Sequence, residues 1–176
     1  MAKITSFKPL ASDNARVLIL GSMPSEVSLQ ENQYYAHPRN SFWFIMGELL
    51  GFKPELDYHA RTALLIKKGV SVWDVLRACF REGSLDSAIQ DSSVVVNDFE
   101  SFLLKYHHLK YIFFNGARAE QLFNKYVLPT LPATLDYLQY QRLPSTSPAH
   151  AAMRPEEKLS SWGIVKDKLA EAVLNQ

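Results

Sequence analysis

The chain has 176 residues, of which 21% are charged and 47% hydrophobic, so its size and composition are those of an ordinary globular domain. Seven Gly and nine Pro exclude a collagen-like or linker-dominated chain, and no apolar run approaches the roughly 18 residues of a membrane-spanning helix. The opening MAKITSFKPL lacks the apolar core and cleavage site of a secretory signal. We therefore expect a single domain over residues 1–176 that is soluble, cytoplasmic and monomeric.

The single cysteine, Cys79, excludes an internal disulfide, a cysteine-rich zinc site and an iron–sulfur cluster, which takes about four thiolates. Because the histidines are scattered, we expect no metal and no cofactor. The 19 basic and 18 acidic residues give a formal charge of +1. A polyanionic partner would therefore be held by a local patch and not by overall charge.

Apolar runs alternate with helical patterns along the chain. The runs predict strands at 16–20, 70–72, 109–114 and 138–143. Helical spacing predicts helices from Phe42 to Gly51, over 56–68, from Asn97 or Asp98 to Tyr106, over 117–127, and from Pro155 onward. We interpret 73–80 as one or two helical turns and 22–40 as a long loop without helical periodicity.

Alternation of strand and helix favours an α/β fold, with a short parallel sheet covered by helices on both faces. Ligands of such sheets bind beyond the carboxyl ends of the strands. Three segments follow predicted strands and should converge there: GSMPS (21–25), NGAR (115–118) and LPSTSPAH (143–150).

These segments differ in what they can bind. GSMPS lacks the spacing of dinucleotide and phosphate-loop motifs, but a turn of small residues exposes backbone N–H groups; it is alternatively only a strand-ending turn. STSP places hydroxyls beside a proline and can hold a phosphate through side-chain and main-chain donors. The stretch from Tyr34 to Trp43 combines aromatic side chains with a His, an Arg and an amide, and aromatic faces stack on nucleic-acid bases.

The segment YAHPRNSFW resembles the FAHPxNxFW segment of the mismatch-specific uracil-DNA glycosylases. GSMPS stands where the uracil-DNA glycosylase superfamily has GQDPY or GINPG, and STSPA stands where it has HPSPL or NPSGL. With Asn115-Gly116-Ala117 and VSVWDVL in the same order, the resemblance spans 17–150 and is nearest to the hypoxanthine-DNA (deoxyinosine) glycosylase branch.

This resemblance implies a three-layer α/β/α fold of the uracil-DNA glycosylase type. It also implies an enzyme that hydrolyses the N-glycosidic bond of a deaminated base flipped out of DNA, hypoxanthine first and uracil second. Such hydrolysis needs oriented water on one side of the sugar and hydrogen-bond donors toward the departing base.

Two departures from the family pattern bear on catalysis. Met23 replaces the Asp or Asn that activates water in related enzymes, and a thioether cannot do this. Ser145 replaces the His or Asn that donates to the departing base. The resemblance therefore leaves Asn40 as the main catalytic candidate, orienting water or the nucleotide without acting as a strong base, with Ser145 beside it; Asn40 is alternatively, or additionally, a helix cap.

The remaining expected roles follow from the same resemblance. The expected substrate-binding residues are Gly21, Ser22, Met23, Pro24, Tyr35 as a stacking platform and Asn115 at the base edge. The expected DNA-binding residues are Ser25, His37, Ser147, Pro148, His150 and Arg154, with His150, Met153 or Arg154 as the wedge in the duplex.

Several alternatives remain open from the sequence. Tyr35 is otherwise a core aromatic, Asn115 a helix cap, and His37 a solvated loop residue. Asp74 either shapes the pocket floor or caps a helix. For the whole chain, the alternatives are a lesion-binding module without catalysis and a small α/β hydrolase acting on free nucleosides.

Overall fold

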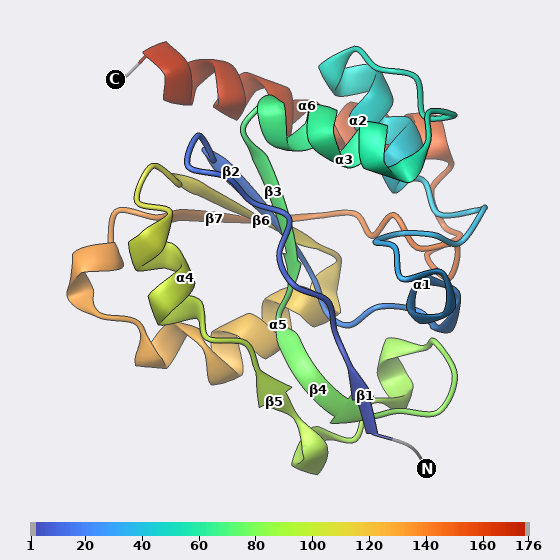
Figure 1. Ribbon diagram of the computed structural model, residues 1–176. Helices are drawn as coiled ribbons and strands as arrows, with labels where there is room; N and C mark the ends of the chain where they lie inside the picture. Colours follow the sequence, from blue (N-terminus) through green and yellow to red (C-terminus); the bar gives the residue numbers. More distant parts are fainter. Residues whose placement is uncertain (1–2, 175–176) are drawn as a thin grey trace.

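A computed structural model describes residues 3–174, so the first two and last two residues of the predicted 1–176 domain lie outside the described part. A four-stranded parallel sheet runs through its middle (Figure 1). In spatial order its strands are β3 (Val70–Asp74), β2 (Val17–Gly21), β6 (Tyr111–Asn115) and β7 (Gln139–Leu143). The central position of β2 explains why its apolar run is continuous, since all five of its residues are buried.

Helices cover both faces of this sheet (Figure 1). One face carries α2 (Phe42–Leu50), α3 (Tyr58–Lys67) and α6 (Pro155–Leu174), and the other carries α4 (Phe99–Lys105) and α5 (Ala117–Tyr126). Alternate residues of β2 contribute to the two cores: Val17 and Ile19 pack on the α6 side, and Leu18 and Leu20 pack on the α5 side. The predicted α/β/α arrangement is therefore confirmed.

The prediction of helical turns over 73–80 is wrong. These residues complete β3 and then form β4 (Leu76–Phe80), which pairs antiparallel with β1 (Lys3–Thr5) and β5 (Val95–Val96) in a second, three-stranded sheet. The apolar positions within 73–80 fit a helical spacing as well as a strand, and pairing with distant segments decides between the two.

The segment 22–40 also differs from the predicted loop, because it contains the short helix α1 (Glu26–Glu31). Ser25 caps this helix through its side-chain oxygen, which accepts a hydrogen bond from the Ser28 N–H. Six residues are too few to show a helical period. Short 3₁₀ turns complete the described elements: η1 (Asp86–Ala88), η2 (Asp91–Ser93), η3 (Leu128–Thr130) and η4 (Ala133–Leu135).

The carboxyl ends of the parallel strands meet at one edge of the sheet. In Figure 1, α1, the chain leading into α2 and the chain that follows β7 gather on the right, at this edge. None of the helices within residues 3–174 is long and apolar enough to cross a membrane.

Candidate functional site

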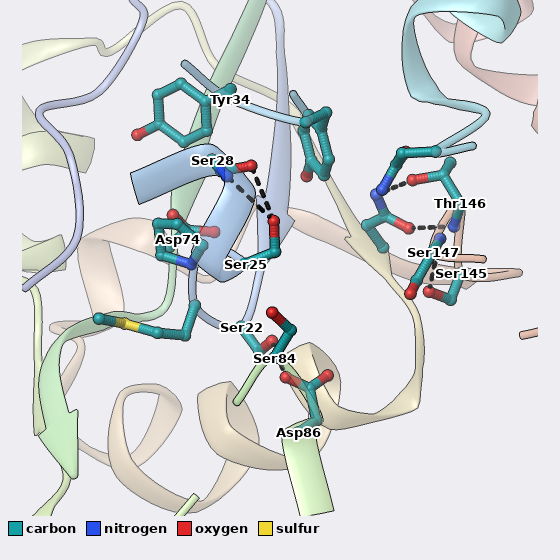
Figure 2. A pocket seen from close by; sticks show the side chains of 16 residues that line it. Ser22, Ser25, Ser28, Tyr34, Asp74, Ser84, Asp86, Ser145, Thr146 and Ser147 are labelled. Carbon is teal, nitrogen blue, oxygen red and sulfur yellow. Dashed lines mark hydrogen bonds between the residues drawn. The ribbon is translucent and has the colours of Figure 1, made fainter. Parts of the chain in front are cut away.

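A pocket of about 100 Å³ lies at this edge (Figure 2). Ten residues predicted from the sequence line it: Gly21, Ser22, Met23, Pro24, Ser25, Tyr35, Asn40, Asn115, Ser145 and Ser147. The other lining residues are Ser28, Tyr34, Asp74, Ser84, Asp86 and Thr146. The pocket is smaller than the roughly 300–1,000 Å³ of usual ligand sites. Its size therefore suits one small group, such as a single base, and not a whole nucleotide.

Gly21 ends β2 at the floor of the pocket. A Cβ atom at this position would lie 2.6 Å from Asp74 Oδ1 and 3.3 Å from the Tyr35 hydroxyl oxygen. The absence of a side chain therefore lets these two polar groups approach the backbone of the GSMPS segment (21–25). Met23, two residues further on, is buried, belongs to the core on the α5 side and also lines the pocket.

Asn40 precedes Ser41, the N-cap residue of α2, and it bonds to the start of this helix while also lining the pocket. Its Oδ1 accepts a hydrogen bond from the Phe42 N–H at 3.0 Å, at the start of α2. Within residues 3–174, its Nδ2 group has no hydrogen-bond partner, and a carbonyl oxygen has a second lone pair. The two roles left open for Asn40 are thus compatible in one conformation.

Tyr35 has a left-handed backbone, with φ of 55°, in the turn that precedes α2. Its ring stacks on Phe42 with centroids 4.0 Å apart and an interplanar angle of 22°. Tyr35 also lines the pocket, so it combines the core contact and the pocket position that were weighed from the sequence. Burial raises the pKa of its hydroxyl, which stays protonated.

Asn115 holds the segment that follows β7 in place. Its Nδ2 donates to the Thr146 hydroxyl at 2.9 Å, and its Oδ1 accepts from the Thr146 N–H at 2.8 Å. The Thr146 carbonyl in turn accepts from the Ser41 N–H at 3.0 Å, which links the loop to the start of α2. Asn115 does not cap α5, whose N-cap is Gly116. The contact of Asn115 with a base stays a prediction.

The turn at 145–147 is closed by its own hydroxyls and supported by a buried lysine. Ser145 Oγ accepts from the Ser147 N–H at 3.2 Å, and Ser147 Oγ accepts from the Ala149 N–H at 3.2 Å. Lys158 is only 3% exposed, and its ammonium donates to the Ser147 carbonyl at 3.2 Å. Burial lowers the pKa of Lys158. No sequence signal identified this lysine, because its position under the turn depends on how α6 packs.

Two carboxylates line the pocket: Asp74, for which the sequence left a place at the pocket floor or a helix cap open, and Asp86, which the sequence analysis did not single out. Asp74 ends β3, is 3% exposed, caps no described helix, and its Oδ2 atom has no hydrogen-bond partner within residues 3–174. Burial, with the charge of Asp86, raises the pKa of Asp74 to about 7, and Arg81 opposes this shift. Asp86 accepts from the Ser22 hydroxyl at 2.6 Å, and burial raises its pKa as well. Figure 2 shows Asp86 beside Ser22.

A groove of about 470 Å³ adjoins the pocket, and Ser25, Asn40, Ser84 and Ser147 line both cavities. The predicted DNA contacts His37 and Pro148 line this groove, together with Glu26, Val27, Arg39, Leu85 and Ala149. His150 and Arg154 line neither cavity. Their contact with DNA stays a prediction. Within residues 3–174, no three His, Cys, Asp or Glu side chains group closely enough to hold a metal ion.

Most of the chain matches the model of one protein family. The family described as the Uracil DNA glycosylase superfamily matches residues 8–167, so this chain belongs to that superfamily.

Two related proteins and one solved structure are similar to this chain over most of its length. A hypoxanthine DNA glycosylase of Methanosarcina barkeri (strain Fusaro) is 36% identical over 66% of this chain and 73% of its own length. A hypoxanthine DNA glycosylase of Methanosarcina acetivorans (strain C2A) is 37% identical over 64% of this chain and 71% of its own length. The solution NMR structure of a candidate uracil DNA glycosylase from Methanosarcina acetivorans superposes with a TM-score of 0.77, at 31% identity, covering 96% of this chain and 99% of the other.

Proposed function

We propose that this protein is a DNA glycosylase that releases hypoxanthine, and secondarily uracil, from DNA and leaves an abasic site. The observation that supports it most is the convergence of Asn40, the 21–25 backbone, Ser145 and Asp74 on one pocket of about 100 Å³. The names of the two relatives given above support hypoxanthine as the first substrate.

The target base enters the pocket after flipping out of the duplex, at a cost of a few kcal/mol. Tyr35, held from behind by Phe42, offers a ring face for stacking. Ser22 and Met23 line the pocket, and in this proposal their backbone N–H groups donate to a base carbonyl.

Asn40 positions the attacking water. The Nδ2 group and the second lone pair of Oδ1 together offer a donor and an acceptor at the pocket wall. An amide has no useful basicity, so Asn40 acts by orientation. The C1′–N bond breaks with its electron pair on the base, the water oxygen bonds to the oxocarbenium-like sugar, and the proton that this water then loses is balanced by the one that the departing base anion takes up. Ser145 keeps its hydroxyl proton for donation, because its oxygen only accepts from the Ser147 N–H.

In its protonated form, the Asp74 carboxyl recognises the lactam group of a deaminated base. Hypoxanthine presents an N–H beside a carbonyl, and a neutral carboxylic acid pairs with both, donating to the oxygen and accepting from the N–H. A buried carboxyl with a raised pKa supplies such a neutral donor. An ionised carboxylate would instead repel the negative charge that develops on the departing base.

The turn at 145–147 binds the phosphate next to the lesion. Its hydroxyls and main-chain donors offer hydrogen bonds, and the buried Lys158 ammonium behind Ser147 adds a positive charge. His37 accepts the Arg39 N–H on Nδ1, so its neutral ring carries the proton on Nε2, ready to donate in the adjoining groove.

The test is a panel of labelled duplexes and single strands carrying hypoxanthine, uracil or xanthine, treated with alkali to reveal abasic sites, alongside free deoxyinosine. Asn40→Ala should remove most base release, while its loss of a cap costs only about 1 kcal/mol. Asp57→Ala is the matched control, because Asp57 caps α3 through the Ala60 N–H away from the pocket.

Three outcomes would contradict the proposal. Binding of lesion DNA without release of any base would favour the lesion-binding module. Hydrolysis of free deoxyinosine, with DNA left intact, would favour a nucleoside hydrolase. Base release by folded Asn40→Ala at nearly the parent rate would reduce Asn40 to a helix cap.

A further inference from the structure

The backbone around Tyr35 is held on both sides by side-chain hydroxyls. The N–H group before it, on Tyr34, donates to the Tyr58 hydroxyl at 3.0 Å. The N–H group after it, on Ala36, donates to the Ser28 hydroxyl at 3.2 Å. Tyr35 itself has φ of 55°, in the left-handed region that residues other than glycine seldom adopt. Because this conformation is costly, contacts from outside the turn at 34–36 must stabilise it.

Both hydroxyls belong to helices that hold them in place. Ser28 lies within α1, is only 3% exposed and is hydrogen-bonded to Ser25 through its N–H and its hydroxyl (Figure 2). Tyr58 is the first residue of α3, and its ring packs edge-on against Trp43 with centroids 5.9 Å apart. Trp43, on α2, donates from Nε1 to the Tyr34 carbonyl at 3.0 Å. The turn at 34–36 is therefore tied to three helices.

This turn decides where the Tyr35 ring points. The ring stacks on Phe42 with centroids 4.0 Å apart, and Tyr35 lines the pocket. Tyr34, in contrast, is only 4% exposed, and its hydroxyl donates to the Lys8 carbonyl at 2.8 Å. A change of φ at Tyr35 to the usual negative range would turn its Cα–Cβ bond and take the ring away from Phe42, because the side-chain torsions start from that bond. The stacking face therefore depends on the backbone conformation of the turn.

We propose that Ser28 and Tyr58 are positioning residues for base release, because their hydroxyls hold the turn at 34–36 and so set the Tyr35 ring before a base arrives. This inference rests on the proposed function, in which that ring stacks on the flipped base. A preorganised ring lowers the ordering cost that binding would otherwise carry. Ser28 also lines the pocket, so direct contact of its hydroxyl with the base is the competing explanation. Tyr58 lines neither the pocket nor the adjoining groove, and it separates the two explanations.

The first test removes one hydroxyl at a time, in Ser28→Ala and Tyr58→Phe. The controls are Ser93→Ala, which removes an acceptor of a backbone N–H, and Tyr111→Phe, which removes a hydroxyl that donates to a carboxylate. Neither control residue lines the pocket or the groove. In single-turnover release of hypoxanthine we expect each of the first two variants to be about fivefold slower, the effect of about one hydrogen bond. The controls should stay within about twofold of the parent.

The same two substitutions are then made in a Tyr35→Ala protein, which has no ring to position. Residues that act through one group are not additive, so Ser28→Ala and Tyr58→Phe should now change the rate by less than about twofold. Equal losses with and without the Tyr35 ring would overturn the inference, since the hydroxyls would then act on the base directly or on the fold in general. No loss from either variant in the parent would overturn it as well.

The second test needs no base release. In the free protein, stacking on Phe42 shifts the NMR signals of the Tyr35 ring upfield. Ser28→Ala and Tyr58→Phe should move these signals toward those of a free tyrosine, whereas the two controls should not. Because Tyr58→Phe keeps the whole ring, it carries the test even where Ser28→Ala does not fold.

Unchanged Tyr35 signals in the folded variants would refute the positioning role, whatever the rates. Failure of the parent to release any base would instead contradict the proposed function. The Tyr35 signals would still decide whether the Ser28 and Tyr58 hydroxyls hold the ring.

Discussion

Replacing Asp74 by Asn keeps the size of a buried side chain and removes its proton equilibrium. Burial and Asp86 raise the pKa of Asp74 from 3.8 to about 7. The native state therefore binds this proton more tightly than the unfolded state. As a result, the native protein loses stability as the pH rises from 3.8 to about 7. A shift of about three units corresponds to about 4 kcal/mol, at 1.36 kcal/mol per unit.

Because Asn is neutral at every pH, Asp74→Asn should raise the free energy of unfolding by about 2 kcal/mol at pH 5.5 and up to about 4 kcal/mol at pH 8. Urea unfolding followed by tryptophan fluorescence measures both values. Asp136→Asn, at an exposed aspartate, is the control and should change stability by less than about 0.5 kcal/mol. An equal gain from Asp74→Asn at the two pH values would refute the reasoning, since Asp74 would then not titrate between them.

The pH dependence of base release tests the protonation of Asp74 independently of stability. If the protonated acid pairs with the lactam, the parent rate of hypoxanthine release should fall about tenfold per pH unit above a pH near 7. Asp86 raises and Arg81 lowers the pKa of Asp74, and the charge of Asp74 in turn raises the pKa of the Tyr34 and Tyr35 hydroxyls. Asp74→Asn, whose amide donates and accepts like the neutral acid, should stay active and show no such fall. A parent rate that increases through pH 7 would contradict the role given to the neutral acid.

Three further predictions concern the surroundings of the pocket. Gly21→Ala should lower the free energy of unfolding, measured in urea, by about 1–3 kcal/mol, since the new Cβ would lie 2.6 Å from Asp74 Oδ1. The same change should remove most base release. Lys158→Met should keep the fold but weaken DNA binding by about tenfold in a titration, because it removes the charge behind Ser147; unchanged affinity would contradict this. With a net charge of +1, log affinity against log salt should fall far less steeply than the slope of about −10 seen for lac repressor.

Local sequence was sufficient for much of the fold and for most of the pocket lining. The buried runs in β2 and β6 are continuous because central parallel strands are covered on both faces, and this pattern is visible without tertiary information. Parallel strands also place their carboxyl ends together, so the segments that follow β2, β6 and β7 were expected to converge, and they do. The predicted bounds of the matching elements differ from the observed ones by at most two residues at either end, as fraying ends allow.

Only the tertiary structure decided what depends on distant partners. Residues 76–80 are a strand because β1 and β5 pair with them, and α1 exists because Ser25 caps a segment too short for periodicity. Asp74 and Asp86 are ordinary carboxylates in the sequence; the pocket takes them out of water and gives Asp74 its raised pKa. Lys158 becomes a support for the 145–147 turn only through the packing of α6. The sequence specifies which side chain stands at each position, whereas the whole fold sets how deeply it is buried and which groups it contacts. Burial and contacts in turn fix the chemistry of the site.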